Sequence, residues 1–133
     1  MANAPIFPAT PKVSWGVVSL ENTNYDGTGN VSLLFTAGVT GARVDTLKAL
    51  SLGTNEATVF RLFLNNGSTT ETSANNSLIL ELTFSAVTTS QTSALTSQEE
   101  VLDFAIPSGY CLYGAVGVTL TNGYQITILG GDY

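Results

Sequence analysis

Apolar and polar residues alternate along almost the whole chain, and this spacing limits it to a fold built of strands. Residues 78–85 (LILELTFS) show the pattern clearly: leucines at every second position and then Phe84 project to one side, while Glu81, Thr83 and Ser85 project to the other. A repeat of two is that of a half-buried β-strand, whereas a helix repeats its apolar residues every three to four positions. The chain is therefore predicted to be all-β.

The same alternation predicts eight strands separated by turn-forming residues. They cover residues 13–19, 31–37, 43–51, 57–65, 78–85, 101–106, 110–120 and 124–129. The separators, such as NYDGTGN, GVTG and PSG, are rich in residues that accept turn geometry or bond to the nearby backbone. Eight short strands without intervening helices predict a single-domain antiparallel β-sandwich of jelly-roll-like topology over residues 13–133. Residues 1–12 are expected to form an extended N-terminal arm.

Two segments leave their local structure open. Residues 96–99 (TSQE) have the spacing of a capping box that begins a helix, yet residues 101–106 alternate like a strand, which is the preferred prediction. Around Gly123, residues 118–128 (VTLTNGYQITI) fit a hairpin with a bulged three-residue loop. They also fit a corner at which the chain passes from one sheet to the other, as a jelly roll requires.

The alternation also assigns side chains to the core or to the surface. Trp15 lies in a strand between Val13 and Val17, and this apolar row is expected to pack in the core. Arg61 and Glu81 are expected to share a solvated outer face, where an ion pair contributes about 0–1 kcal/mol.

The charge balance excludes some partners. Only 11% of residues are charged, against roughly 25% in typical domains, so Ser, Thr and Asn must cover most of the surface. Ten acids and four bases give a net charge of -6, which would repel nucleic acid. Since no apolar run approaches the roughly 18 residues of a membrane span, no membrane association is expected. The N-terminal residues do not resemble a secretion signal, so use without general secretion is expected.

The residues that usually carry catalysis are scarce. With no histidine, neither a Ser-His-Asp nor a Cys-His nucleophile system can form, and the lone Cys111, flanked by apolar and aromatic residues, is expected to be buried and inert. The carboxylates considered as a glycosidase-like pair are Glu99, Glu100 and Asp103, or Glu56 with Asp45. Because each lies where a solvated strand edge or loop carries acids anyway, we predict no enzyme, no catalytic residue, no cofactor and no metal.

Candidate contacts with a partner lie in the arm and in two loops. Prolines at three-residue spacing favour an extended arm, which either folds over its own sandwich or lies on a neighbouring subunit. Tyr25 is an aromatic residue in a loop, and the polar connection after Asn66 (NGSTTETSANN) is expected to be a long hairpin loop with a free tip. The candidate contact residues are Pro5, Ile6, Phe7, Pro8, Tyr25 and Asn66.

Four segments resemble a group of small virion proteins from tailed bacteriophages. They are DGTGNVSLLFTAG, GARVDTLKALSLGTNEATVFRLFLNNG, NNSLILELTF and IPSGYCLYGAVG. The resemblance covers most of the chain and rests on turn and strand patterns rather than on catalytic signatures. It implies a jelly-roll-like capsid cement or decoration protein, a homotrimer that sits across junctions between major capsid proteins.

We therefore expect a structural virion protein that is made in the host cytoplasm and stabilises the head from the capsid surface. A second expectation is a recognition module: a tail, fibre or collar component, or a carbohydrate-binding β-sandwich that uses Tyr25 and the 66–76 loop.

Overall fold

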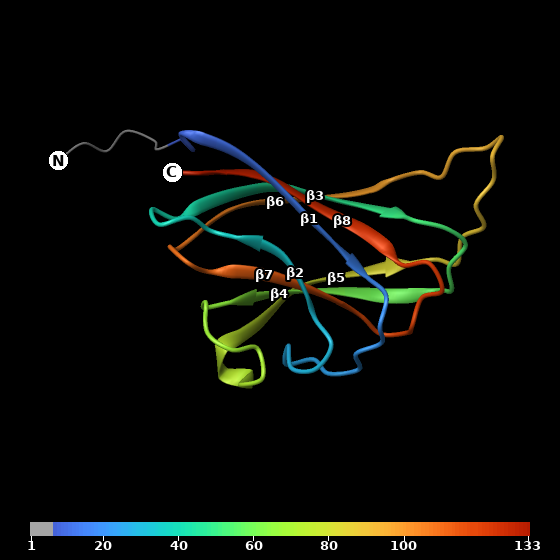
Figure 1. The fold of residues 1–133 in the computed structure, drawn as a ribbon, viewed down its shortest axis with the longest axis horizontal. Helices are drawn as coiled ribbons and strands as arrows, with labels where there is room; N and C mark the ends of the chain where they lie inside the picture. Colours follow the sequence, from blue (N-terminus) through green and yellow to red (C-terminus); the bar gives the residue numbers. More distant parts are fainter. Residues whose placement is uncertain (1–6) are drawn as a thin grey trace.

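The computed structural model describes residues 7–133 as two antiparallel sheets packed face to face (Figure 1). The strands are β1 (Thr10–Val18), β2 (Ser32–Thr36), β3 (Ala42–Ser51), β4 (Thr58–Asn65), β5 (Asn76–Phe84), β6 (Gln98–Ile106), β7 (Cys111–Val116) and β8 (Tyr124–Asp132). One short 3-10 helix, η1 (Ser73–Asn75), precedes β5. Each predicted strand overlaps a strand of the structure, so the all-β sandwich is confirmed. Within this described range, no helix has the length and apolarity needed to cross a bilayer.

The strand order is that of a jelly roll. One sheet, named sheet I, has the order β1-β8-β3-β6, and the other, named sheet II, has the order β2-β7-β4-β5. Antiparallel ladders join β1 to β8, β2 to β7, β3 to β6 and β4 to β5. The chain therefore follows the path of one long hairpin rolled up so that successive pairs alternate between the sheets.

Aromatic rings join the two sheets inside the core. Phe84 of sheet II stacks on Phe60 of the same sheet, with ring centroids 5.6 Å apart, and on Tyr124 of sheet I, with centroids 4.2 Å apart. Aliphatic side chains from both sheets complete the core around them. Each fully buried side chain of this size contributes roughly 1.5–3 kcal/mol, so the contact between the sheets dominates the stability of the fold.

The first strand turns the opposite face to the core from the one predicted. Trp15 is 60% exposed and Val13 is exposed as well, so the apolar row points to solvent. On the inward side, a Cβ on Gly16 would come within 2.9 Å of the Leu33 carbonyl oxygen, which means that small residues allow β1 to approach β2 closely. The prediction that Trp15 packs in the core is wrong, because alternation separates two faces of a strand without saying which one is covered.

Residues 98–106 form a strand, as preferred over a helix. Its register against β3 shifts between Val44 and Thr46, and Asp103 in β6 has a φ of 54°. It is the one non-glycine residue among residues 7–133 with a positive φ, a region that Asp tolerates better than most residues. This bulge bends the edge of sheet I and directs the Asp103 carboxylate onto Arg43.

The segment around Gly123 turns a corner rather than a hairpin, since β7 lies in sheet II and β8 in sheet I. Gly123 has a φ of 77°, as expected for the turn. The buried Asn55 holds this corner in place. Its Nδ2 donates to the Gly123 carbonyl oxygen at 2.8 Å, and its Oδ1 accepts from the N–H groups of Asn122 and Gly123 at 2.8 and 3.1 Å.

Replacing Asn55 tests whether this amide fixes the corner. Asn55→Ala leaves the N–H groups of Asn122 and Gly123 without partners, and each costs about 1–3 kcal/mol when buried, whereas the Gly123 carbonyl oxygen still accepts from the N–H of Leu52. We expect the free energy of unfolding to fall by about 2–4 kcal/mol, measured by urea denaturation. Asn66→Ala removes an exposed loop amide and is the control, with an expected loss below about 1 kcal/mol. Equal losses in the two variants would contradict the assignment.

Glu56 provides a second, pH-dependent contact at the corner. Its carboxylate accepts hydrogen bonds from the hydroxyl and the N–H of Thr121. The hydroxyl contact is the main cause that holds the pKa of Glu56 below its usual 4.5, and backbone hydrogen bonds add to it. A carboxyl with a lowered folded-state pKa stabilises the fold above its unfolded pKa, and the contribution is lost as the pH falls through the folded-state value.

Glu56→Gln is therefore expected to be less stable than the parent at neutral pH and to match it in strong acid. Thermal unfolding across the acidic range measures this difference. Glu71→Gln, at an exposed loop position, is the control and should follow the parent throughout. A gap between Glu56→Gln and the parent that stays constant down to strong acid would exclude the ionised carboxylate as its cause.

Candidate functional site

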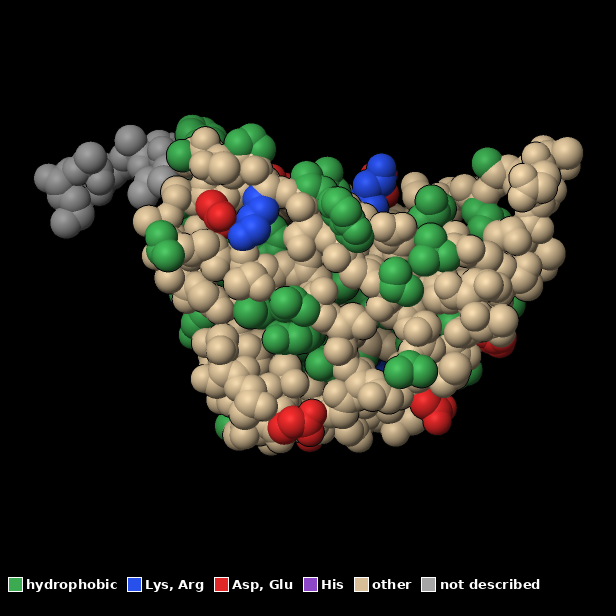
Figure 2. All heavy atoms as spheres, viewed as in Figure 1, with side chains coloured by type: hydrophobic (Ala, Val, Ile, Leu, Met, Phe, Trp, Pro, Cys, Tyr) green, Lys and Arg blue, Asp and Glu red, His purple; other side chains and the backbone are tan. Residues whose placement is uncertain are grey.

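Among residues 7–133, the outer face of sheet I carries apolar side chains that are exposed to solvent. In the ladder registers, Val13, Leu129, Thr46 and Val101 form one row across its four strands. Trp15 and Val101, at 60% and 75%, are among the most exposed large apolar residues of the chain. The apolar sheet face is defined here as Val13, Trp15, Val17, Leu50, Val101 and Leu129. Figure 2 shows hydrophobic side chains spaced along the upper surface over this sheet, with basic and acidic side chains between them.

This face is hollowed beside the connection between β5 and β6. Leu95 and Ser97 from that connection flank a depression of about 460 Å³ that Leu50 and Leu129 also line. In Figure 1 the connection rises at one end of the upper sheet, and in Figure 2 the upper outline dips between the two ends of the molecule. The apolar sheet face is thus a shallow saddle, a shape that fits a convex partner.

The charges on and around this face are paired. Lys48 lies 3.3 Å from Glu99, and Arg43 contacts Asp45 at 3.3 Å and also Asp103. Glu99, Asp45 and Asp103 were among the candidates for a pair of catalytic carboxylates. In the structure each of them contacts a basic side chain rather than another candidate. In the part of the chain that the structure describes, no three His, Cys, Asp or Glu side chains gather as metal ligands would.

The described part of the arm begins against its own sheet. Pro8 lies so close to Gly131 of β8 that a Cβ on the glycine would come within 2.6 Å of the Pro8 Cβ. Phe7, directly before it, is 78% exposed. The other two arm residues predicted as contacts, Pro5 and Ile6, lie outside the described residues.

The loops that carry Tyr25 and Asn66 lie side by side at sheet II (Figure 1). Asn76 joins them, because its Nδ2 donates to the carbonyl oxygens of Asp26 at 3.0 Å and Thr70 at 2.8 Å. The Asn66 amide is used within its own loop, where it donates to Asn75 and accepts from the N–H of Ser68. The structure therefore brings Tyr25 and Asn66 to one region, while Phe7 and Pro8 lie beside sheet I.

The loop over residues 22–30 buries Arg61, which the sequence had assigned to a solvated face. The Tyr25 ring lies over the guanidinium at 4.1 Å, and the Asn22 carbonyl oxygen accepts a hydrogen bond from Nη1 at 3.2 Å. The Arg61 side chain is only 7% exposed, and its Nε is 3.7 Å from a Glu81 oxygen. The predicted pair is adjacent, but its surroundings differ because a loop distant in sequence folds over the strand.

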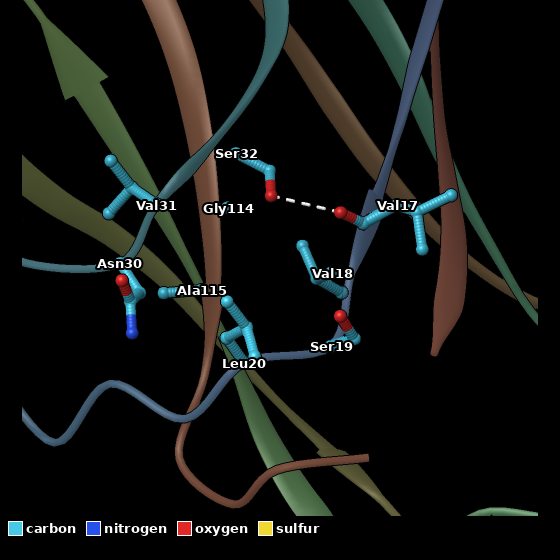
Figure 3. Close-up of a pocket in the computed structure, with 9 residues that line it drawn as sticks. All are labelled: Val17, Val18, Ser19, Leu20, Asn30, Val31, Ser32, Gly114 and Ala115. Atoms are coloured by element: carbon cyan, nitrogen blue, oxygen red, sulfur yellow. Dashed lines mark hydrogen bonds between the residues drawn. The ribbon is translucent and has the colours of Figure 1, made fainter. Parts of the chain in front are cut away.

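Two further features of the described structure are the cavity at the β1–β2 crossover and the lone cysteine. The cavity, of about 280 Å³, is drawn in Figure 3, where the Ser32 hydroxyl donates to the Val17 carbonyl oxygen at 2.9 Å. None of its nine lining residues is charged. Cys111 is buried, as predicted, with its sulfur 3.6 Å from the Thr36 hydroxyl.

Comparison with known proteins found no matching family model, no matching curated protein and no matching solved structure. The candidate surfaces therefore rest on the residues and geometry of this chain alone.

The contact between Tyr25 and Arg61 predicts a graded effect of ring substitutions. Tyr25→Ala removes the ring face and should destabilise the protein by about 1 kcal/mol, a usual value for a partly exposed cation–π contact. The amides of residues 22–28 should also exchange faster with solvent, because the loop loses an anchor. Tyr25→Phe keeps the ring face and should behave like the parent. A loss in the Phe variant as large as in the Ala variant would contradict the contact.

Proposed function

We propose that this chain is a structural protein of a tailed-phage virion, a cement or decoration protein that stabilises the capsid by binding across neighbouring major capsid proteins. The observation that carries the proposal is the apolar sheet face, which presents Trp15 and Val101 to solvent on a rigid four-stranded sheet. The resemblance of four chain segments to small virion proteins supports the same proposal.

Covering the apolar sheet face with another protein lowers the free energy. Apolar residues gathered on one exposed face usually mark a binding site, since burying them in a contact removes them from water. A sheet holds them in place before binding, so little ordering is required. The surrounding hydroxyls and paired charges suit the rim of a contact between proteins.

Stabilisation of a shell then follows from mass action. A ligand that binds the assembled shell better than its dispersed subunits shifts the balance towards the shell. In a homotrimer, three copies of the face would act together, so individually modest contacts would add up to firm attachment. The capsid surface is the corresponding location in the virion.

A recognition module is the second candidate, because Tyr25 is exposed beside two polar loops. A tail, fibre or collar component, or a carbohydrate-binding sandwich, could use such a ring against a sugar face. Binding to glycans or to host cells, without binding to capsids, distinguishes this candidate from the first.

Rebinding to particles that lack the protein tests the proposal. The purified parent should bind stoichiometrically and raise the temperature at which the capsids open. Trp15→Asp, on the edge strand β1 of the apolar sheet face, should weaken binding at least about tenfold, since aromatic anchors often contribute 2 kcal/mol or more. Val39→Asp changes an exposed apolar residue in the β2–β3 turn and is the matched control. Binding by Trp15→Asp equal to that of the control, or no binding by the parent, would contradict the proposal.

A further inference from the structure

Arg61 has two hydrogen-bond donors that no other described residue uses. Its Nη1 donates to Asn22, whereas the buried Nε has no partner and Nη2 makes no hydrogen bond within residues 7–133. Nε and Nη2 lie on the same edge of the guanidinium. This edge binds a carboxylate side-on, through two parallel N–H···O bonds.

Burial of this edge of the guanidinium without a hydrogen-bond partner costs free energy. A buried donor without a partner costs about 1–3 kcal/mol, and more when the group is charged. The nearest carboxylate, that of Glu81, has its oxygen 3.7 Å from Nε, which is beyond hydrogen-bond distance, and Glu81 is itself 45% exposed. Glu81 therefore lies next to the guanidinium without filling its binding edge.

A groove on the outer face of sheet II gives access to the guanidinium. It has a volume of about 570 Å³, and Val59, Thr83, Ser85, Gly117 and Val118 line it together with Arg61. A Cβ on Gly117 would lie 3.6 Å from Nη1 and 3.8 Å from Nη2. Because Gly117 has no side chain, Nη2 can be reached from the groove. The buried Nε is reached only when a ligand displaces the half-exposed Glu81 side chain beside it.

Tyr25 fixes the orientation of this group. Its ring occupies one face of the guanidinium, at 4.1 Å from the central carbon, and leaves the donors in the plane free. Stacking of this kind orients an arginine for a planar, two-bond ligand.

We propose that Arg61 is a carboxylate-binding residue and that its ligand is an Asp or Glu side chain of a polypeptide lying in this groove. The groove is far larger than a carboxylate, and valines and hydroxyl side chains line the remainder, as the flanking residues of a peptide would require. The net charge of -6 disfavours an acidic partner at long range, so recognition depends on the two-bond contact at Arg61. The site lies on sheet II and is independent of the apolar sheet face on sheet I.

The Nε–H signals of the arginines in nitrogen–proton NMR spectra test the proposal. The chain has two arginines, so Arg43, which is already paired with Asp45 and Asp103, is an internal control. The peptide Ala-Val-Glu-Val-Ala, with blocked ends, should shift the Arg61 signal saturably and leave that of Arg43 unchanged. Its Gln analogue should shift neither signal. Acetate, at matched ionic strength, should bind at least about tenfold more weakly than the peptide, because it does not occupy the rest of the groove.

Two variants complete the test. Glu81→Gln removes the competing carboxylate at a half-exposed position and should strengthen peptide binding several-fold. Arg61→Lys keeps the charge but lacks the two-donor edge and should weaken binding at least about tenfold, as followed through the Tyr25 ring signals.

Three results would overturn the proposal. An Arg61 signal that the Glu peptide does not move would exclude the site, as would equal binding of the Glu and Gln peptides. Acetate binding as tight as that of the peptide would exclude a polypeptide ligand.

Discussion

Contact between the inner faces of two sheets is the interaction on which the rest of this structure depends. Phe84, between Phe60 and Tyr124, joins sheet II to sheet I through a continuous stack of rings. Because the inner faces of both sheets form the core, only the outer faces are left to take on different surface properties. A loop folds across one of them and buries Arg61, whereas the other, as far as residues 7–133 show, exposes apolar side chains such as Trp15 and Val101.

The strand pattern was readable from the sequence because period-two alternation is a local property. The chain corner at Gly123 was one of two alternatives, and the choice required knowing that β7 and β8 belong to different sheets. For Trp15 the alternation was predicted correctly, but the prediction that its side of the strand faces the core was wrong. Which face is covered depends on small residues such as Gly16, where β1 closely approaches β2. Arg61 was missed because a loop that lies far away in the sequence covers it.

The two outer faces have complementary properties for binding. The apolar sheet face offers exposed apolar area, from residues such as Trp15 and Val101, beside a depression that Leu50 and Leu129 line together with polar side chains. The groove at Arg61 offers a single directional contact with few polar neighbours. A protein with both could attach through one sheet and select a partner through the other. Each function depends on a rigid body, which the rolled pairing of all eight strands provides.

In our proposal, this sandwich adheres to a protein shell through the outer face of sheet I. Electron cryo-microscopy of phage heads carrying the protein tests it most directly, because density at the resolution of strands shows both its location and its orientation. We predict density across junctions between capsid subunits, with β1 and β8 turned towards the shell. Heads without such density, or a bound protein with sheet I turned to solvent, would contradict it.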